Sequence, residues 1–200
     1  MGKVMTMQEA VSAYVKSGSL LFLGGMQHGE PFAAVHEILR QKIDHLKTVS
    51  CLTTSTSLLI GEGRVDKVFT GYYGQDTKRF YWLNRAIAMG KYPEFQEYSH
   101  FGIAQALHAG EMGVSFMPVR SMVGSDMLKY NPSIKLIDDP FTGGKIGAVE
   151  AIVPDVGILH VQRCDPEQRH TRLRLSPHTN LSTQHSCSQS NQFSSFANHL

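Results

Sequence analysis

Residues 20–31 read LLFLGGMQHGEP, and this stretch decides how the chain folds. Its four leading apolar residues are typical of a short strand that is buried on both faces. Gly24 and Gly25 end that strand. Pro31 suits the first turn of a helix, and apolar residues recur at helical spacing after it. A buried strand, a glycine turn and a helix together predict one unit of an α/β fold.

The same alternation of strand-like and helix-like segments continues through the first 165 residues. A capping box at Thr6 and a C-capping glycine at Gly18 predict an N-terminal helix. The further helices are predicted after Pro31, around 57–60, at 80–89 and at 100–112. The further strands are predicted at 46–52, 65–73, 94–98, 114–119, 146–152 and 156–161. This order predicts a mostly parallel sheet that is flanked by helices on both faces.

Length and composition suit one globular domain. The chain has 200 residues, of which 42% are hydrophobic and 18% are charged, and its net charge is +2. So small a charge argues against nucleic acid or an anionic membrane as a partner. The three cysteines form no C-x-x-C pair, and we find neither a signal peptide nor a run of about 20 apolar residues. We expect a cytoplasmic protein.

The composition changes near residue 166. Residues 1–165 form the predicted domain, whereas residues 166–200 are rich in Ser, Gln, His, Asn and Thr. Apolar residues occur only singly there, so the segment cannot bury enough surface to offset its ordering entropy. We expect it to be disordered.

Several short segments occur in a characteristic order along the chain. They are LFLGGM (21–26), GEP (29–31), EILRQ (37–41), LLIGEG (58–63), GYYG (71–74), GSD (124–126), PFTG (140–143), PDV (154–156) and HVQR (160–163). Taken together, these segments resemble family I CoA-transferases, and the α subunits of the glutaconate CoA-transferase type are the most similar. They span residues 3 to about 165. In the family this region continues into further strands and helices, so the resemblance implies a truncated α-type domain with a tail foreign to the family. A frameshift is the simplest hypothesis for that tail.

The resemblance also implies a reaction. Such enzymes move CoA from an acyl-CoA to a carboxylic acid. A glutamate attacks the thioester and forms an anhydride, and the CoA thiolate then attacks the glutamyl carbonyl to give an enzyme–CoA thioester. In two-chain members that glutamate lies on the β-type partner, so no catalytic residue is expected in this chain. Coenzyme A is a substrate, and no permanently bound cofactor is expected.

Three groups of residues are candidates for binding substrate or CoA. The backbone of Gly24, Gly25 and Gly29 follows a strand end and suits a thioester oxygen, a carboxylate or part of CoA, although a tight turn explains the glycines too. By resemblance, the segment with Gly71, Tyr73, Gly74 and Gln75 lines the acyl pocket, although aromatic residues at a strand end are often core. The third group lies after the strand at 114–119 and comprises Arg120, Gly124, Ser125 and Asp126.

In that third group, Arg120 suits a CoA phosphate or a substrate carboxylate, although an arginine is more often solvated or salt-bridged. Ser125 and Asp126 suit the cap of a short helix or the subunit interface. Neither H-x-x-x-H nor H-E-x-x-H occurs, so no metal site is expected.

Other functions stay open. Some proteins that resemble this family are ring-opening hydrolases of CoA thioesters, and their partner lacks the catalytic glutamate. A truncated chain is also compatible with an inactive remnant or a fragment that only binds its partner. The hypothesis that the chain is a sugar-phosphate isomerase is supported only by a similar architecture, and the family-like segments argue against it.

Overall fold

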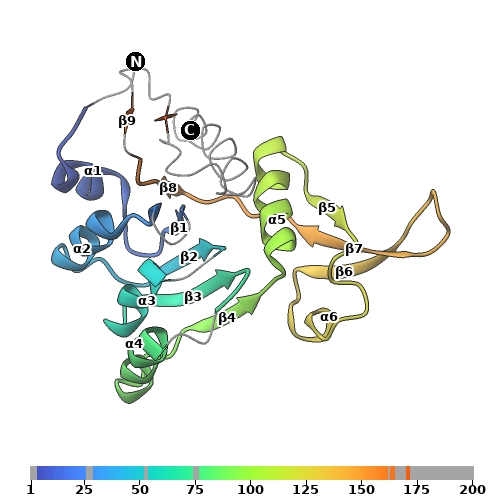
Figure 1. Cartoon of the computed structure of the whole chain (residues 1–200), viewed down its shortest axis with the longest axis horizontal. Coiled ribbons are helices and arrows are strands. Elements are labelled where there is room, and N and C mark those ends of the chain that lie inside the picture. Colours follow the sequence, from blue (N-terminus) through green and yellow to red (C-terminus); the bar gives the residue numbers. More distant parts are fainter. Residues whose placement is uncertain are drawn as a thin grey trace, which may run out of the picture.

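The computed structural model describes residues 4–25, 29–51, 54–73, 77–161, 163–164 and 170–171. Its larger layer is a five-stranded parallel sheet in the order β4-β3-β2-β1-β8 (Figure 1). The strands are β1 (Leu20–Leu23), β2 (Leu46–Ser50), β3 (Val65–Thr70), β4 (Glu94–Glu97) and β8 (Val156–Ile158). All neighbouring pairs in this sheet are parallel, which confirms the predicted α/β fold.

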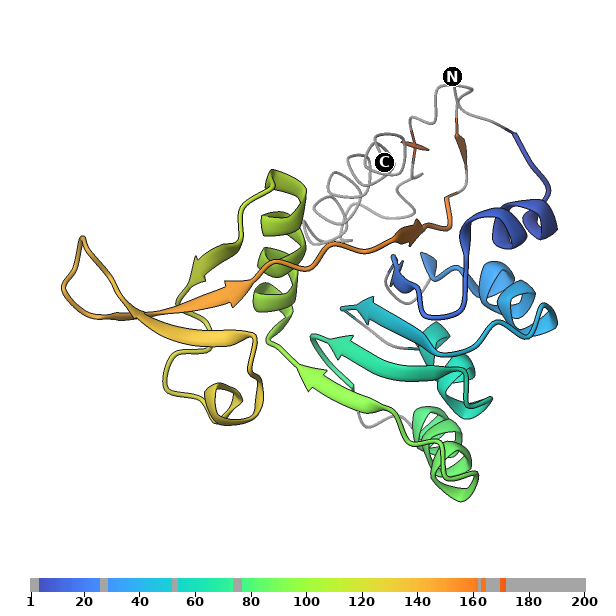
Figure 2. The ribbon, with the colours of Figure 1, turned by 180° about the vertical axis from the view of Figure 1, so that it is seen from behind.

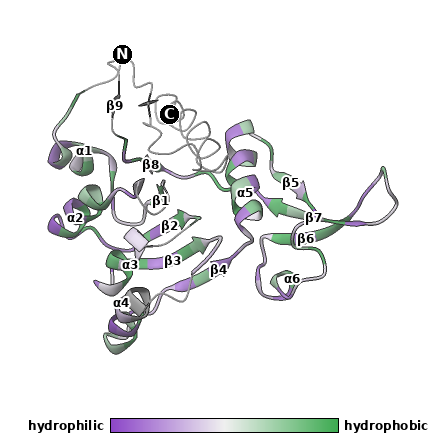
Figure 3. Cartoon of the chain, viewed as in Figure 1, coloured by the Kyte–Doolittle hydropathy of each residue, from purple (hydrophilic) through white to green (hydrophobic). Residues whose placement is uncertain are grey.

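Helices cover both faces of this sheet. They are α1 (Met7–Tyr14), α2 (Phe32–Arg40), α3 (Thr54–Gly61), α4 (Thr77–Ala88) and α5 (His100–Met112). Alternate side chains of β1 show the two sides, because Leu21 and Leu23 pack with the core under α1–α4 while Phe22 packs with the core under α5. In Figure 3, α2 and α5 each carry apolar and polar residues, as expected of helices that cover a sheet on one side.

A second, smaller sheet lies beyond α5. It is antiparallel, in the order β5-β7-β6, and consists of β5 (Phe116–Val119), β6 (Ile134–Asp138) and β7 (Lys145–Glu150). The short helix α6 (Met127–Tyr130) lies between β5 and β6 in the chain. The sequence predicts two of these strands but not their separate sheet, and it misses β6. Only Ile134 of the five β6 residues is buried and three are exposed, so this strand contributes little to the apolar core.

The chain crosses from one sheet to the other alongside α5. Figure 2 shows β7 leading past this helix to β8. There the backbone N–H of Ile152 donates to the carbonyl oxygen of Ala106 at 2.9 Å. Gly110 faces the same crossing, because a Cβ on it would lie 2.3 Å from the Ile152 carbonyl oxygen. The helix therefore lies against the crossing backbone itself.

Element ends follow local chemistry. The predicted capping box at Thr6 is confirmed, with both of its hydrogen bonds formed. The first helix ends at Tyr14, however, so Gly18 is not its cap but takes a φ of +87° in the turn that precedes β1. Gly113 forms the left-handed cap of α5. Ser99 begins that helix by accepting a hydrogen bond from Gly102 N–H at 2.9 Å.

The last described elements are two-residue strands, β9 (Arg163–Cys164) and β10 (His170–Thr171), which pair antiparallel. The rest of the segment expected to be disordered lies outside the described residues. In the described part of the chain, no helix has both the length and the apolar character needed to cross a membrane.

Candidate functional site

The parallel strands bring several loops together at one edge of the main sheet. Since all five strands run the same way, the segments that follow β1, β2, β3 and β4 leave from this carboxyl edge, where open α/β sheets bind ligands. Two of the three predicted groups, the glycine turn after β1 and the segment at Gly71 and Tyr73, follow strands at this edge. The predicted Gly74 and Gln75 lie outside the described residues.

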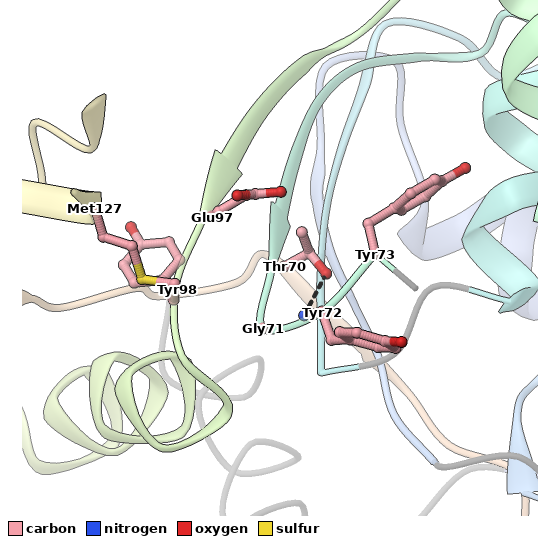
Figure 4. A pocket seen from close by; sticks show the side chains of 7 residues that line it. All are labelled: Thr70, Gly71, Tyr72, Tyr73, Glu97, Tyr98 and Met127. Atoms are coloured by element: carbon pink, nitrogen blue, oxygen red, sulfur yellow. Dashed lines mark hydrogen bonds between the residues drawn. The ribbon is translucent and has the colours of Figure 1, made fainter. Parts of the chain in front are cut away.

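An open pocket of about 370 Å³ lies where β3 and β4 end. It is lined by Thr70, Gly71, Tyr72, Tyr73, Glu97, Tyr98 and Met127, whose side chains are drawn in Figure 4. The Tyr72 N–H donates to the Thr70 hydroxyl oxygen at 3.1 Å, which tightens the turn after β3. Sequence reasoning placed Gly71 and Tyr73 at such a pocket, but it missed Glu97 and Met127.

His100 borders the turn after β3. Its ring lies 5.8 Å from the Tyr72 ring, and its Nε2 lies 3.2 Å from the carbonyl oxygen of Cys51. Gly71 needs its small size here, since a Cβ would lie 3.0 Å from the His100 ring. Burial raises the pKa of the Cys51 thiol, which disfavours the reactive thiolate form.

The glycine turn after β1 is held by backbone contacts. The Gly24 N–H donates to the Ile158 carbonyl oxygen at 2.9 Å, so it is not directed at a ligand. Gly25 has a φ of +106°, and a Cβ on it would lie 2.0 Å from the Gly29 carbonyl oxygen. Of the three predicted glycines, Gly25 and Gly29 are therefore in close backbone contact. Only glycine fits at position 25.

Glu30 links this turn to α3. Its side chain is only 6% exposed, and its Oε2 accepts a hydrogen bond from the Ser55 N–H at 2.5 Å. Ser55 lies in the first turn of α3, where a carboxylate is favoured by the helix dipole. The other carboxylate oxygen, Oε1, has no hydrogen-bond partner among the described residues. In the sequence, Glu30 is marked only by its place in the GEP segment, and nothing there predicts its hydrogen bond to α3.

The third predicted group lies on the turn between β5 and α6. None of its members lines the pocket, although Met127, which follows Asp126 directly, does. Asp126 precedes α6 but makes no capping hydrogen bond and instead pairs with Lys129 at 2.6 Å. The Ser125 hydroxyl donates to the Met122 carbonyl oxygen at 2.8 Å. The predicted cap is therefore not formed by these side chains.

The two other members of this group are exposed. Gly124 takes a φ of +81°, as the turn requires. Arg120 forms no ion pair within the described residues, but its charge has a small effect on Asp139. The main cause of the lowered Asp139 pKa is a hydrogen bond from the Thr142 hydroxyl at 2.7 Å. Arg120 is therefore available to a ligand or partner.

A buried polar network joins the pocket to the second sheet. Asn131 is 3% exposed, and its Nδ2 donates to the Glu97 carbonyl oxygen at 2.7 Å. Its Oδ1 accepts from Gln96 Nε2 at 2.8 Å, and the same Nε2 donates to the Tyr98 hydroxyl oxygen at 2.8 Å. Burial is the main cause of the raised pKa of Tyr98. The network holds the end of β4 against the segment that carries Met127.

Replacing Asn131 with alanine should lower the free energy of unfolding by about 2–4 kcal/mol. The change leaves Gln96 Nε2 and the Glu97 carbonyl oxygen buried without this partner. Urea unfolding of the purified protein measures the effect. Asn84→Ala is the matched control, since Asn84 is exposed on α4 and should change stability by less than about 0.5 kcal/mol. Equal stabilities of the two variants would contradict a structural role for the network.

No group of three or more His, Cys, Asp or Glu side chains within the described ranges is arranged to hold a metal ion. What the described site offers is aromatic and apolar surface, one carboxylate and backbone groups at a sheet edge. Apolar and aromatic surface with a few polar groups is typical of pockets for organic ligands.

Comparison with known proteins agrees with this geometry. The family model for coenzyme A transferases matches residues 4–182. The A-type subunit of 3-oxoadipate CoA-transferase from Pseudomonas knackmussii is 36% identical over 82% of this chain and 60% of its own length. The A-type subunit of glutaconate CoA-transferase from Acidaminococcus fermentans is 33% identical over 84% of this chain and 58% of its own length. The IpdA subunit of a cholesterol ring-cleaving hydrolase from Rhodococcus jostii is 25% identical over 82% of this chain and 57% of its own length.

A solved structure supports the same assignment. The glutaconate CoA-transferase of Acidaminococcus fermentans superposes with a TM-score of 0.73 and 31% identity, over 86% of this chain and 61% of the matched chain. The chain thus spans about 60% of the length of these curated relatives. Because the family model covers most of the chain and the fold agrees, this chain belongs to the coenzyme A transferase family.

Proposed function

We propose that this chain is the α-type subunit of a CoA-transferase that moves CoA between an acyl-CoA and a carboxylic acid. The observation that carries the proposal is the open pocket at the carboxyl edge of the sheet, in a chain that belongs to the coenzyme A transferase family. Two relatives are named as the A-type subunits of such enzymes, which supports a β-type partner for this chain. The free thiol of Cys51 fits a cytoplasmic site of action.

In this proposal the two subunits divide the work. The partner carries the glutamate that exchanges one thioester for another through covalent catalysis. This chain holds the acyl group in the pocket formed by Gly71, Tyr72 and their neighbours, at the same edge of the sheet as the turn at Gly25. The exposed Arg120 attracts a CoA phosphate. Coenzyme A enters and leaves as a substrate and is not a resident cofactor.

An exchange assay on the protein in its native assembly tests the proposal. The assembly is incubated with one acyl-CoA and a second carboxylic acid, and mass spectrometry follows the new acyl-CoA. We expect ping-pong kinetics, and a CoA thioester on the partner subunit when acyl-CoA is the only substrate. Absence of both the exchange and the thioester, across acids of different size and charge, would overturn the assignment.

A ring-opening hydrolase is the alternative, and the similarity to the Rhodococcus jostii hydrolase subunit is the observation behind it. The same assay separates the two functions. A hydrolase consumes water and its CoA-thioester substrate, and it forms no second acyl-CoA from an added acid. The partner's sequence gives an independent answer, because the transferase needs a glutamate there and the hydrolase does not.

A further inference from the structure

The pocket carries an unusual charge for an enzyme that handles acids. Of the seven residues that line it, Glu97 alone is charged at neutral pH, and it is an anion. Figure 4 shows its exposed side chain at the end of β4, close to the end of β3 at Thr70. No described lysine, arginine or histidine forms an ion pair with it, whereas Glu94 on the same strand pairs with Lys67 at 2.8 Å.

The backbone at Glu97 is fixed by strand pairing and hydrogen bonds, so Glu97 does not lie on a flexible loop. Glu97 is the last residue of β4 and stands opposite Thr70 in the parallel register with β3. Its carbonyl oxygen accepts from Asn131 Nδ2, and the next N–H, of Tyr98, donates to the Thr70 carbonyl oxygen at 2.9 Å. The exposed side chain of Glu97 therefore extends from a fixed strand end that lines the pocket.

We propose that Glu97 is a specificity-determining residue that selects acyl groups with an uncharged far end and rejects those that end in a second carboxylate. The inference rests on the proposed function, since it takes this pocket to hold the acyl group. A second carboxylate would face a like charge with no described cation beside it, and the repulsion disfavours binding. An uncharged end that carries a hydroxyl or amide can instead donate a hydrogen bond to the Glu97 carboxylate.

This selectivity would set the chain apart from relatives that it resembles in sequence. Glutaconate and 3-oxoadipate, the acids in two of their names, are both dicarboxylates. The aromatic faces of Tyr72 and Tyr98 and the thioether of Met127 complete an apolar surface around the charge. Together they fit a monocarboxylic acid with an apolar or hydrogen-bond-donating chain.

A matched pair of acids tests the proposal. Glutarate and its monoamide have nearly the same shape and differ in charge at one end. Their binding to the protein in its native assembly is measured by titration calorimetry, and their turnover as CoA acceptors by the exchange assay. We expect the monoamide to be preferred by roughly tenfold in both measurements.

Variants assign the preference to one residue. Glu97→Gln should bring the two acids to within about twofold of each other, because the like charge is gone. Glu94→Gln is the control, since it removes a glutamate of the same strand that does not line the pocket, and it should keep the tenfold preference.

Preference of the unaltered protein for glutarate, binding of neither acid, or an unchanged ratio in Glu97→Gln would each overturn the inference. Selective binding of the monoamide without CoA exchange would refute the proposed function and leave the specificity of the pocket standing. CoA exchange that favours dicarboxylates would support the proposed function and overturn the inference about Glu97.

Discussion

Replacing Gly110 with alanine should lower the free energy of unfolding by about 2–3 kcal/mol. Alanine is the better helix former, which favours the variant by about 1 kcal/mol in an open helix. The added Cβ would, however, lie 2.3 Å from the Ile152 carbonyl oxygen and 3.0 Å from its carbon. Both are backbone atoms, and the Ile152 N–H is bound to the Ala106 carbonyl oxygen of the same helix. The helix and the crossing segment must therefore move apart, and overpacking outweighs propensity.

Urea unfolding with the midpoint and slope compared measures this effect. Gly144→Ala is the matched control, because a Cβ there meets only the Thr142 hydroxyl oxygen at 3.7 Å, an ordinary contact. It adds the same methyl group and should change stability by less than about 1 kcal/mol. If Gly110→Ala is as stable as this control, α5 is not pressed against the crossing, and the two sheets are joined more loosely than the structure shows.

Local chemistry explains why much of the main sheet is readable from the sequence. The run LLFLGG encodes β1 and its turn. Gly113, which takes the left-handed conformation, ends α5. These signals lie within a few residues of the structure that they specify. The parallel order then follows, because short apolar strands alternating with helices have few other ways to bury both faces.

The second sheet and the pocket network depend on contacts that are distant in sequence. Asn131 and Gln96 are 35 residues apart, and nothing local marks them as partners. β6 pairs with β7, yet three of its five side chains are exposed. The spacing of apolar residues in this strand therefore does not indicate a buried face. Glu97 is placed at a strand end by sequence, but only the fold reveals that its charge faces the pocket. Glu30 likewise gains its role from α3, 25 residues away.

Replacing Gly25 with alanine should reduce CoA exchange by about a hundredfold, because a displacement of about 1 Å at a site is enough for such a loss. At a φ of +106° a Cβ is strained, and here it would lie 2.0 Å from the Gly29 carbonyl oxygen and 3.0 Å from the Glu30 nitrogen. The chain cannot relieve this contact without moving Glu30, whose carboxylate is bound to the first turn of α3. The turn after β1 therefore shifts at the same carboxyl edge of the sheet as the pocket.

Gly24→Ala separates this effect from the mere addition of a methyl group to the turn. A Cβ at Gly24 would meet Leu159 Cδ2 at 2.2 Å and Phe22 Cε1 at 3.0 Å, both on side chains that can rotate, and its φ is not in the left-handed region. We expect exchange to fall less than about tenfold in this control. The initial rate of exchange at saturating substrate, measured for variants whose circular dichroism matches that of the unaltered protein, decides the matter. Equal losses at the two glycines would mean that the turn merely packs against β8. A loss confined to position 25 would mean that the backbone bend, held by Gly29 and Glu30, is what the reaction requires.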